Sequence, residues 1–439
     1  EVLLDAPGFA GEKVLDAFVL ADHLAEQESA EEEDEPDDER GHGHREIAGG
    51  QDLVHRDDDV DVHLDERKAG AADVGPDAED AGGPDGLVLP ERLRIDARVR
   101  EREDGRVGFN FPTTATQDGA SYTFMFPMML ADFALWRDEA AWLRRRMPGL
   151  VHTMEGLRAC ENGDGLVANL PGWNFHDWTD WPGGSNGGCA EAAGTNAVNN
   201  LLYVYALKSA AAVADALGER EFAAAYRTRA DRTSAAVVRM FWDEAKGLLS
   251  DDLGRRSYSE HAQSLALVLD ALPPEKAARA TEGLLARTDL VRTTVYFRHY
   301  LFEAYAKIGR GDLILKGLDL WRDYVAKGLT TAEEAPDTDR SESRSDCHAW
   351  SSHPLYHLHA SVLGLRPSAP FFGAVRIAPS PGTLRRIRAT TPTPRGDVVC
   401  SLDFENGEAH GRIVLPERLS GEFLWRGRRM ELVPGVNDL

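Results

Sequence analysis

The sequence predicts a mainly α-helical fold, an incomplete (α/α)6 toroid, which is followed by a small antiparallel β-sandwich. Between residues 122 and 364 the chain reads as successive pairs of amphipathic helices, and glycine or proline stands at the joint of most pairs. After Pro367 the pattern changes to short alternating strands separated by turn sequences such as PSPG and ENGE. Antiparallel helix pairs repeated along a chain are typical of a toroid, because each pair buries its apolar face against its neighbours.

We therefore divide the chain into an acidic segment over residues 1–105, the toroid over 106–366 and the sandwich over 367–439. Residues 1–100 contain 30 Asp and Glu against 10 Lys and Arg, so they hold −20 of the net charge of −25. Runs such as EEEDEPDDER repel themselves and bury little apolar surface. We expect the first segment to be disordered, above all over 29–90, or to be a mistranslated reading of GC-rich DNA. Only residues 12–28 carry a helical pattern.

The predicted toroid consists of four helix pairs and one further helix. The pairs cover residues 122–136 with 138–158, 195–217 with 219–243, 258–272 with 274–287, and 294–309 with 311–327, and the last helix covers about 352–364. Gly218 fits a helix C-cap, because glycine tolerates the left-handed backbone that such a cap needs. Pro273 and Pro274 separate the third pair, and Gly309 and Gly311 form the hinge of the fourth.

The predicted sandwich has six candidate strands. They are AVRIAP, LRRIRATT, DVVCSLDFE, AHGRIVLP, GEFLWRG and MELVPG. Val, Ile and Leu alternate with polar residues along them, and they carry neither clustered carboxylates nor any tryptophan besides Trp425. We therefore expect this domain to be structural.

Composition excludes several classes of partner. A net charge of −25 would repel nucleic acid and anionic membranes, and no run approaches the roughly 20 apolar residues that a membrane span needs. The four cysteines lie far apart, which predicts reduced thiols and neither a disulfide framework nor a metal knuckle. We expect no cofactor, and a cytoplasmic location is favoured.

The segment LPGWNFHDWTDWPGGSNGG, residues 170–188, combines three tryptophans with two aspartates in a glycine-rich loop. An indole face stacks on the C–H face of a sugar, while a neighbouring carboxylate accepts hydrogen bonds from its hydroxyl groups. Trp173, Trp178, Asp177 and Asp180 are therefore candidates for carbohydrate recognition. The alternative is that the tryptophans, Trp181 included, pack beneath the loop.

A second segment, GLTTAEEAPDTDRSESRSDCHAWSSHP, covers residues 328–354. We expect its adjacent carboxylates, Glu333 and Glu334, at the C-terminal end of one helix, with His348 at the start of the next. Helix ends of a toroid meet at one rim, and glycoside cleavage needs a carboxylate there to activate water or to attack the sugar. The alternative is a solvated pair of glutamates at a helix end.

Several side chains near the second segment also suggest a metal site. They are Cys347, His348, His353 and His357, and HPLYH places the last two on one helix face. No acidic third ligand or HExxH pattern accompanies them, so a packed or sugar-binding histidine is the preferred interpretation and no metal is predicted. Glu260 and His261 in SYSEHAQSL are interpreted mainly as a helix cap, with a pocket-facing role as the alternative.

Taken together, these stretches resemble the bacterial α-L-rhamnosidases, inverting glycoside hydrolases built on an (α/α)6 barrel with β-sandwich domains. The likeness runs from about residue 122 to residue 439. It rests on LPGWNFHDWTDW, NAVNNLLYVYAL, SEHAQSLAL, GLTTAEE with SRSDCHAWSSHPLYHL, and FFGAVRIAPSPGTL, in that order. The resemblance implies that Glu334 is the general base, that His348 contacts the sugar, and that Trp173, Asp177 and Trp178 line the pocket. Glu333 should then be the solvated neighbour.

The sequence departs from the family at the general acid. That residue belongs to a DCP-x3-E-like segment followed by Gly-Asp, and nothing in residues 1–121 resembles it. Loss of general acid catalysis typically costs about 10² to 10⁴ in rate. The acid therefore stays unidentified. Three functions remain open: an α-L-rhamnosidase that releases terminal L-rhamnose from glycosides or oligosaccharides, a catalytically inactive carbohydrate-binding protein, and another α/α-toroid glycosidase such as a trehalase or glucoamylase relative.

Overall fold

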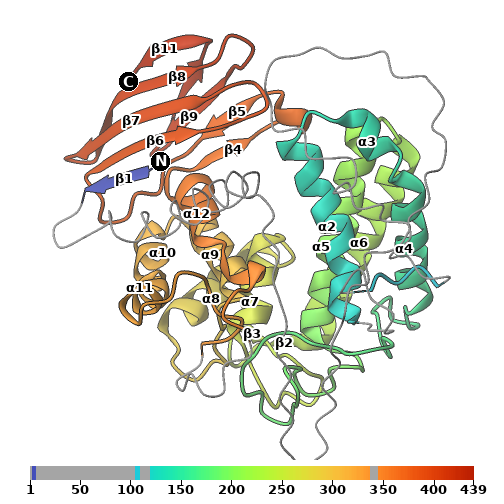
Figure 1. Ribbon diagram of the computed structural model, residues 1–439. Helices are drawn as coiled ribbons and strands as arrows, with labels where there is room; N and C mark the ends of the chain where they lie inside the picture. Colours follow the sequence, from blue (N-terminus) through green and yellow to red (C-terminus); the bar gives the residue numbers. More distant parts are fainter. Residues whose placement is uncertain (1, 6–103, 109–118, 337–344) are drawn as a thin grey trace, which may run out of the picture. The chain divides into compact units, whose positions relative to one another are not determined.

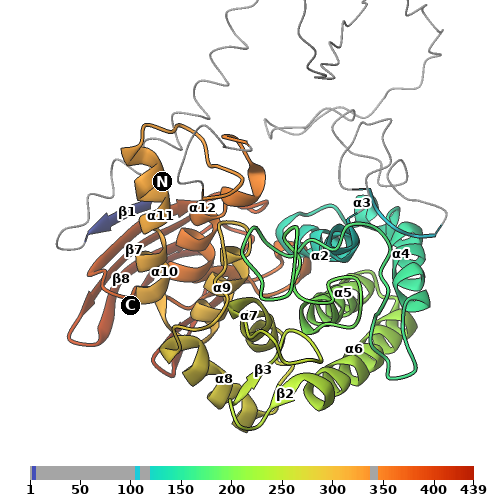
Figure 2. The same ribbon diagram turned by 90° about the horizontal axis from the view of Figure 1, so that it is seen from below.

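The computed structural model describes residues 2–5, 104–108, 119–336 and 345–439. Its helices are α2 (Ala120–Trp136), α3 (Ala140–Arg144), α4 (Met147–Ala159), α5 (Ala197–Ala216), α6 (Arg220–Phe241), α7 (Glu260–Val268), α8 (Pro274–Ala286), α9 (Arg298–Lys307), α10 (Gly311–Gly317), α11 (Asp319–Ala326) and α12 (Pro354–His357). Helices that follow one another pack together, as α5 does on α6, α7 on α8 and α9 on α10 (Figure 1). In addition α5 contacts α2 and α7, and α7 contacts α9, so α6, α8 and α10 lie outside this inner row (Figure 2).

Two of the predicted helices are interrupted. The one expected over 138–158 is split into α3 and α4, because Pro148 at the start of α4 cannot lie inside a longer helix. The one expected over 311–327 is split into α10 and α11 at Leu318. Helix α2 still contacts α3 and α4, and α9 still contacts α10, so the predicted pairing of helices is retained.

The start of α7 is fixed by a side-chain cap that the sequence pattern did not show. Ser259 Oγ accepts a hydrogen bond from the Ala262 amide at 3.2 Å and begins the helix two residues later than expected. The last predicted helix is also different in kind. After the short α12 the chain continues as a π-helical turn, Leu358–Val362, and only then enters the β-domain.

The β-domain consists of two sheets. Its strands are β4 (Leu365–Pro367), β5 (Val375–Ile377), β6 (Arg386–Thr391), β7 (Val398–Glu405), β8 (Glu408–Leu415), β9 (Gly421–Trp425), β10 (Arg428–Leu432) and β11 (Gly435–Asp438). One sheet has the order β1-β6-β7-β8-β11 and the other β10-β9-β5-β4. All pairs are antiparallel, as predicted, except β5 with β9, which run parallel from the pair of Val375 and Gly421 onward. A separate short hairpin, β2 (Trp242–Asp243) with β3 (Leu248–Leu249), follows α6.

The first strand of the larger sheet, β1 (Val2–Asp5), comes from the start of the chain. It pairs antiparallel with β6, so that Val2 lies opposite Ala389 and Asp5 opposite Arg386. The acidic composition gave no sign of this strand. The other expectations for the first segment, disorder over 29–90 and a helix over 12–28, concern residues outside those that the structure describes and remain predictions.

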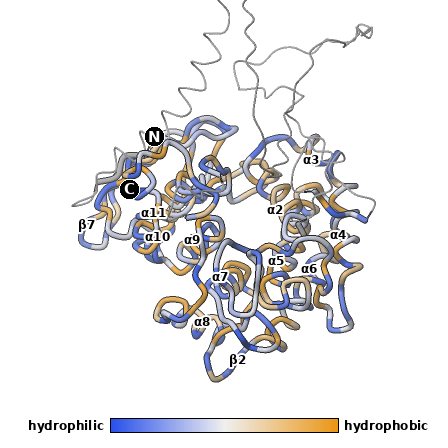
Figure 3. The backbone as a smooth tube through the Cα atoms, turned by 60° about the horizontal axis from the view of Figure 1, so that its bottom comes forward, coloured by the Kyte–Doolittle hydropathy of each residue, from blue (hydrophilic) through white to orange (hydrophobic). Residues whose placement is uncertain are grey.

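The helices and strands bury their apolar side chains in shared cores. Phe302 of α9 and Trp321 of α11 belong to the same cluster as Phe372, Ile377 and Ile387 of the β-domain. Hydrophobic and hydrophilic residues alternate along α6 and α8, as expected for helices with one face on the core (Figure 3). None of the helices in the described ranges is long and apolar enough to cross a membrane. The four cysteines are unpaired thiols, as predicted.

Backbone contacts join the helical part to the β-domain. The Ser380 amide donates to the Val362 carbonyl at 2.9 Å, and the Ala378 amide donates to the Gly364 carbonyl at 3.0 Å. Gly364 has a φ of +73°, and a Cβ atom there would lie 2.0 Å from the Ala378 carbonyl oxygen. Only glycine therefore fits at this junction.

We expect the Gly364→Ala variant to unfold at a clearly lower urea concentration than the wild type. The added methyl group meets backbone and not a flexible side chain, so the free energy of unfolding should fall by about 3 kcal/mol or more. The matched control is Gly218→Ala, where φ is +80° but nothing lies within 4 Å of the added Cβ, so the loss should be about 1 kcal/mol. Equal losses would mean that the junction has no tight contact.

Candidate active site

The aromatic loop, residues 170–188, folds back on itself and is bound to the start of α2. The Ala120 amide donates to the Trp173 carbonyl at 2.9 Å. The amides of His176 and Asp177 both donate to the Gly187 carbonyl, at 2.8 and 3.0 Å. A Cβ atom at Gly187 would lie 2.4 Å from the Phe175 ring, which explains a glycine at that position. The glycine-rich composition thus serves close packing within the loop.

The carboxylate of Asp177 is fully buried and joins the loop to two other parts of the chain. His261 Nε2 lies 2.8 Å from Oδ2, and the Thr294 amide donates to the same oxygen at 2.6 Å. The Thr294 hydroxyl and the Trp178 amide donate to Oδ1, the latter at 3.0 Å. Both oxygens are therefore engaged inside the protein, so Asp177 does not line an open pocket as expected. It positions the loop against α7 and the segment before α9.

Trp178, Glu334 and His348 come together, as the sequence predicted. The indole Nε1–H of Trp178 donates to Glu334 Oε1 at 3.0 Å. Glu334 Oε2 lies 3.8 Å from His348 Nδ1, and the side chains of Glu334 and His348 are 12% and 33% exposed. Burial and the nearby charge of Glu334 raise the pKa of Tyr122 on α2 to about 12, so its hydroxyl keeps its proton near the carboxylate.

The segment that carries the two glutamates is a loop and not a helix end. Helix α11 ends at Ala326, several residues earlier. The Glu334 amide donates to the Ser345 carbonyl at 2.9 Å, and the Trp350 indole N–H donates to the Glu334 carbonyl at 2.8 Å. These bonds hold the backbone of Glu334 on both sides, so the loop fixes its side chain more firmly than a frayed helix end would.

The expectation that Glu333 is solvated is wrong. Glu333 is 1% exposed, and the Ser351 hydroxyl donates to its carbonyl oxygen at 2.6 Å. The chain has no regular secondary structure at these two positions, and it buries Glu333 while Glu334 is partly exposed. Glu334 is thus the more exposed of the two carboxylates, with 12% of its side chain accessible, and its role as the general base stays a prediction.

Aromatic rings surround the indole of Trp178. The ring of Phe175 stacks on Trp350 at 5.7 Å with an interplanar angle of 3°, and Tyr296 stacks on the other part of Trp350 at 4.9 Å. Trp178 lies 4.8 Å from Phe175 and 5.8 Å from Trp173. Sequence analysis missed Tyr296, because nothing in its local pattern distinguishes it from a core tyrosine.

The three tryptophans of the loop have different environments. Trp173 and Trp178 are partly exposed, whereas Trp181 is 6% exposed and packs 4.6 Å from the His261 ring. The packing alternative thus holds fully for Trp181 and in part for Trp173 and Trp178, which also pack against the core. Asp180 is exposed, and together with Trp178 it borders an open depression that is lined mainly by the loop and also by Ala335 and Pro336.

Two other predicted candidates have structural partners. Glu260 is buried, and its carboxylate accepts from Arg292 Nη1 at 2.5 Å and from the Thr293 amide at 2.8 Å. His261 is bound to Asp177, as described above. Neither side chain caps α7, because the cap is Ser259. Both side chains instead bind buried partners that join the start of α7 to other segments.

Comparison with known proteins identifies two matching families. Residues 89–362 match the bacterial alpha-L-rhamnosidase 6 hairpin glycosidase domain, and residues 364–428 match the bacterial alpha-L-rhamnosidase C-terminal domain. The first match confirms the α/α toroid and the second the small β-domain. The match to the glycosidase domain begins at residue 89, earlier than residue 122, where the resemblance in the sequence begins.

Individual relatives agree with this result. The alpha-L-rhamnosidase of Formosa agariphila is 23% identical over 271 residues, which are 57% of this chain and 28% of that protein. The solved GH78 family rhamnosidase of Bacillus sp. GL1 is 27% identical with a TM-score of 0.64, over 72% of this chain and 34% of that one. The alpha-L-rhamnosidase of Aspergillus terreus shares the fold at 16% identity and a TM-score of 0.65, over 78% and 42%. The chain thus spans about a third of the length of these relatives.

The alpha-L-rhamnosidase of Streptomyces avermitilis also shares the fold, at 17% identity and a TM-score of 0.61, over 78% of this chain and 35% of that one. That structure was determined in complex with L-rhamnose.

Replacing Asp177 by asparagine should destabilise the protein markedly. An amide offers one acceptor oxygen, and its NH₂ group would face the donors of His261 and Thr294, so we expect a loss of about 3 kcal/mol in the free energy of unfolding. Asp180→Asn, an exposed change in the same loop, should stay within about 0.5 kcal/mol of the wild type. Urea unfolding measures both, and a harmless Asp177→Asn change would contradict the anchoring role.

Proposed function

Because the chain belongs to the bacterial alpha-L-rhamnosidase family, we propose that it acts on rhamnose-containing glycosides or oligosaccharides and releases terminal L-rhamnose with inversion. The observation that carries this proposal is the contact of Trp178 with Glu334 beside His348. It combines a carboxylate, an aromatic ring and an imidazole at one partly open position. The carboxylate can be one of the two carboxyl groups that hydrolysis requires, and the aromatic ring and the imidazole suit recognition of an uncharged sugar.

In the proposed mechanism Glu334 is the general base. An inverting glycosidase needs a carboxylate that takes a proton from water while the water attacks the anomeric carbon. The Trp178 N–H holds Glu334 Oε1, so the carboxylate keeps one orientation. Glu334 Oε2 lies 3.8 Å from His348 Nδ1, so the carboxylate and the imidazole are neighbours.

Trp173, Trp178 and His348 are the proposed sugar-binding residues. The partly exposed indoles of Trp173 and Trp178 offer apolar faces for the C–H groups of the ring and for the methyl group of a 6-deoxy sugar. The partly exposed imidazole of His348 can donate to or accept from a sugar hydroxyl. Asp177 acts in this scheme through Trp178, whose place in the loop it determines, and not by contact with the sugar.

The proposal leaves the general acid unassigned. Without such a group the leaving oxygen departs unprotonated, which is slow for ordinary glycosides and acceptable for an activated phenol. The sequence keeps the base and the sugar-binding residues but has no match to the acid segment in residues 1–121. This combination favours, as the second candidate, a carbohydrate-binding protein that does not hydrolyse ordinary glycosides, and activated substrates separate the two.

We expect an aryl α-L-rhamnoside with a good leaving group to be hydrolysed and to give the inverted anomer by NMR. Glu334→Gln should reduce this rate by at least about 10², because the water loses its base. Glu333→Gln is the matched control and should retain hydrolysis per folded molecule, since Glu333 points into the protein. Loss in Glu333→Gln alone would move the base by one position. Unchanged rates in both variants would contradict the hydrolase proposal.

Calorimetric titration should show that L-rhamnose binds and that glucose binds at least about tenfold more weakly, because the pocket favours an apolar methyl group at the stacking face. Trp178→Ala should weaken rhamnose binding at least about tenfold, since stacking area and the orientation of Glu334 are both lost. Trp425→Ala in the β-domain should leave it unchanged. Equal affinity for the two sugars would remove the recognition argument, whatever the outcome of the hydrolysis experiment.

A further inference from the structure

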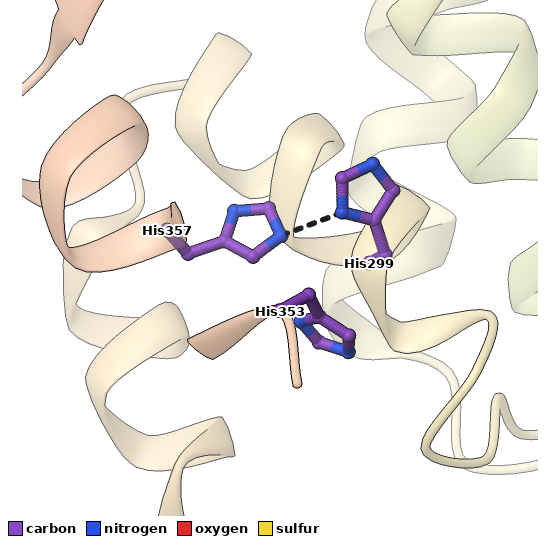
Figure 4. A group of neighbouring side chains, drawn as sticks. All are labelled: His299, His353 and His357. Atoms are coloured by element: carbon purple, nitrogen blue, oxygen red, sulfur yellow. Dashed lines mark hydrogen bonds between the residues drawn. The ribbon is translucent and has the colours of Figure 1, made fainter. Parts of the chain in front are cut away.

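Three histidines from separate parts of the chain converge inside the helical region. His299 lies on α9, His353 directly precedes α12, and His357 ends α12 (Figure 4). One ring nitrogen from each can be chosen so that all three lie within 4.8 Å of one another. The sequence predicted no metal, because no acidic third ligand or HExxH pattern accompanies His353 and His357. The third imidazole comes from 54 residues before His353 and could be placed only by the fold.

The protonation of His353 follows from its partner. His353 Nε2 lies 2.9 Å from the Val295 carbonyl oxygen, which can only accept a hydrogen bond, so Nε2 carries the proton. In the neutral ring with its proton on Nε2, Nδ1 presents a lone pair. This Nδ1 is buried and has no hydrogen-bond partner within the described part of the chain. A buried acceptor without a donor is costly, which makes it a sign of a missing ligand.

His357 is oriented in a similar way. Its Nδ1 lies 2.9 Å from Ser361 Oγ, a hydroxyl that can accept from Nδ1–H even while Arg366 Nη2 donates to it at 3.0 Å. That arrangement leaves His357 Nε2 facing His299 Nδ1 at 3.0 Å, as Figure 4 shows. His353 and His357 thus each have one ring nitrogen held by an oxygen outside the cluster. The other nitrogen of His357 faces His299, and that of His353 has no hydrogen-bond partner among the described residues. This outer-acceptor arrangement is the usual support of metal-binding histidines.

We propose that His299, His353 and His357 bind one divalent transition-metal ion, and that Zn²⁺ is the ion this set of ligands fits best. Neutral imidazole nitrogens are preferred Zn²⁺ ligands, with Zn–N distances of about 2.0 to 2.1 Å, which in a tetrahedron place the nitrogens about 3.3 Å apart. To bind the ion, His357 Nε2 and His299 Nδ1, now 3.0 Å apart, have to separate slightly. Nitrogens of the cluster that lie up to 4.8 Å apart have to approach by about 1.5 Å, which rotations of the rings can supply.

Such an ion would have a structural role. It would tie α9, which begins just after Thr294, to the segment that follows His348, and so connect two of the segments that form the candidate active site. The ring of His353 also packs 5.0 Å from Trp321 and 5.7 Å from Phe302, so the ion would lie at the edge of a hydrophobic core. The inference does not depend on hydrolase activity.

The test is calorimetric titration of the full-length chain with ZnCl₂ after treatment with a chelator and its removal. We expect one equivalent to bind and the melting temperature to rise with Zn²⁺. His299→Gln, His353→Gln and His357→Gln should each weaken binding at least about tenfold. The matched control is His359→Gln. His359 lies on the same segment, but its Nδ1 bonds to Thr391 Oγ1 at 2.8 Å, outside the cluster, so affinity should not change.

A measurement on the wild type guards against variants that fail to fold. X-ray absorption of the protein loaded with one equivalent of Zn²⁺ should show an inner shell of nitrogen or oxygen with the scattering pattern of imidazole. Absence of stoichiometric binding to the wild type would overturn the proposal. So would a sulfur shell, which would place the ion at a cysteine, or equal affinity in the three cluster variants and the wild type. The cluster would then be a packed group of neutral histidines.

Discussion

The geometry of the candidate site depends on a charge buried beneath the aromatic loop, the carboxylate of Asp177. Taking a carboxylate out of water costs several kcal/mol unless donors replace the lost hydration. Here the donors come from His261 on α7 and from Thr294 ahead of α9, so the charge is stable only while these segments stay together. The loop, which has little regular secondary structure of its own, is thereby fixed by two elements of the helical scaffold.

The buried carboxylate of Asp177 also affects the position of Glu334, the proposed general base. Trp178 follows Asp177 directly, and its amide is one of the donors to that carboxylate. With the backbone fixed in this way, the indole N–H can meet Glu334, while Trp350 holds the backbone of Glu334 from the other side. The buried carboxylate of Asp177, the side chain of Trp178 and the partly exposed carboxylate of Glu334 thus form one chain of contacts. Hydrolysis would use only Glu334, but the position of Glu334 depends on Asp177.

Sequence patterns were sufficient for whatever depends on periodicity. They predicted the helix pairs and the change to strands near Pro367, because helix faces and turns depend on neighbouring residues. The meeting of Trp178, Glu334 and His348 was expected from the family resemblance and not from periodicity, since Trp178 and Glu334 lie 156 residues apart. The patterns failed where the partner is distant. Asp177 looked like a sugar ligand because Thr294 lies 117 residues away, and Glu333 looked solvated because a helix was assumed where the chain has no regular secondary structure. Pairing of β1 with β6 and the parallel contact of β5 with β9 likewise depend on the fold.

The central claim is that Asp177 sets the contact between Trp178 and Glu334. Its most direct test is the exchange of the Trp178 indole hydrogen with solvent, followed by NMR in the wild type and in Asp177→Asn under conditions in which both are folded. The account predicts a protected hydrogen in the wild type and exchange that is at least about tenfold faster in the variant, because the bond to Glu334 opens more often. Equal protection in the two proteins would show that the contact is formed without the buried carboxylate, and would contradict the account.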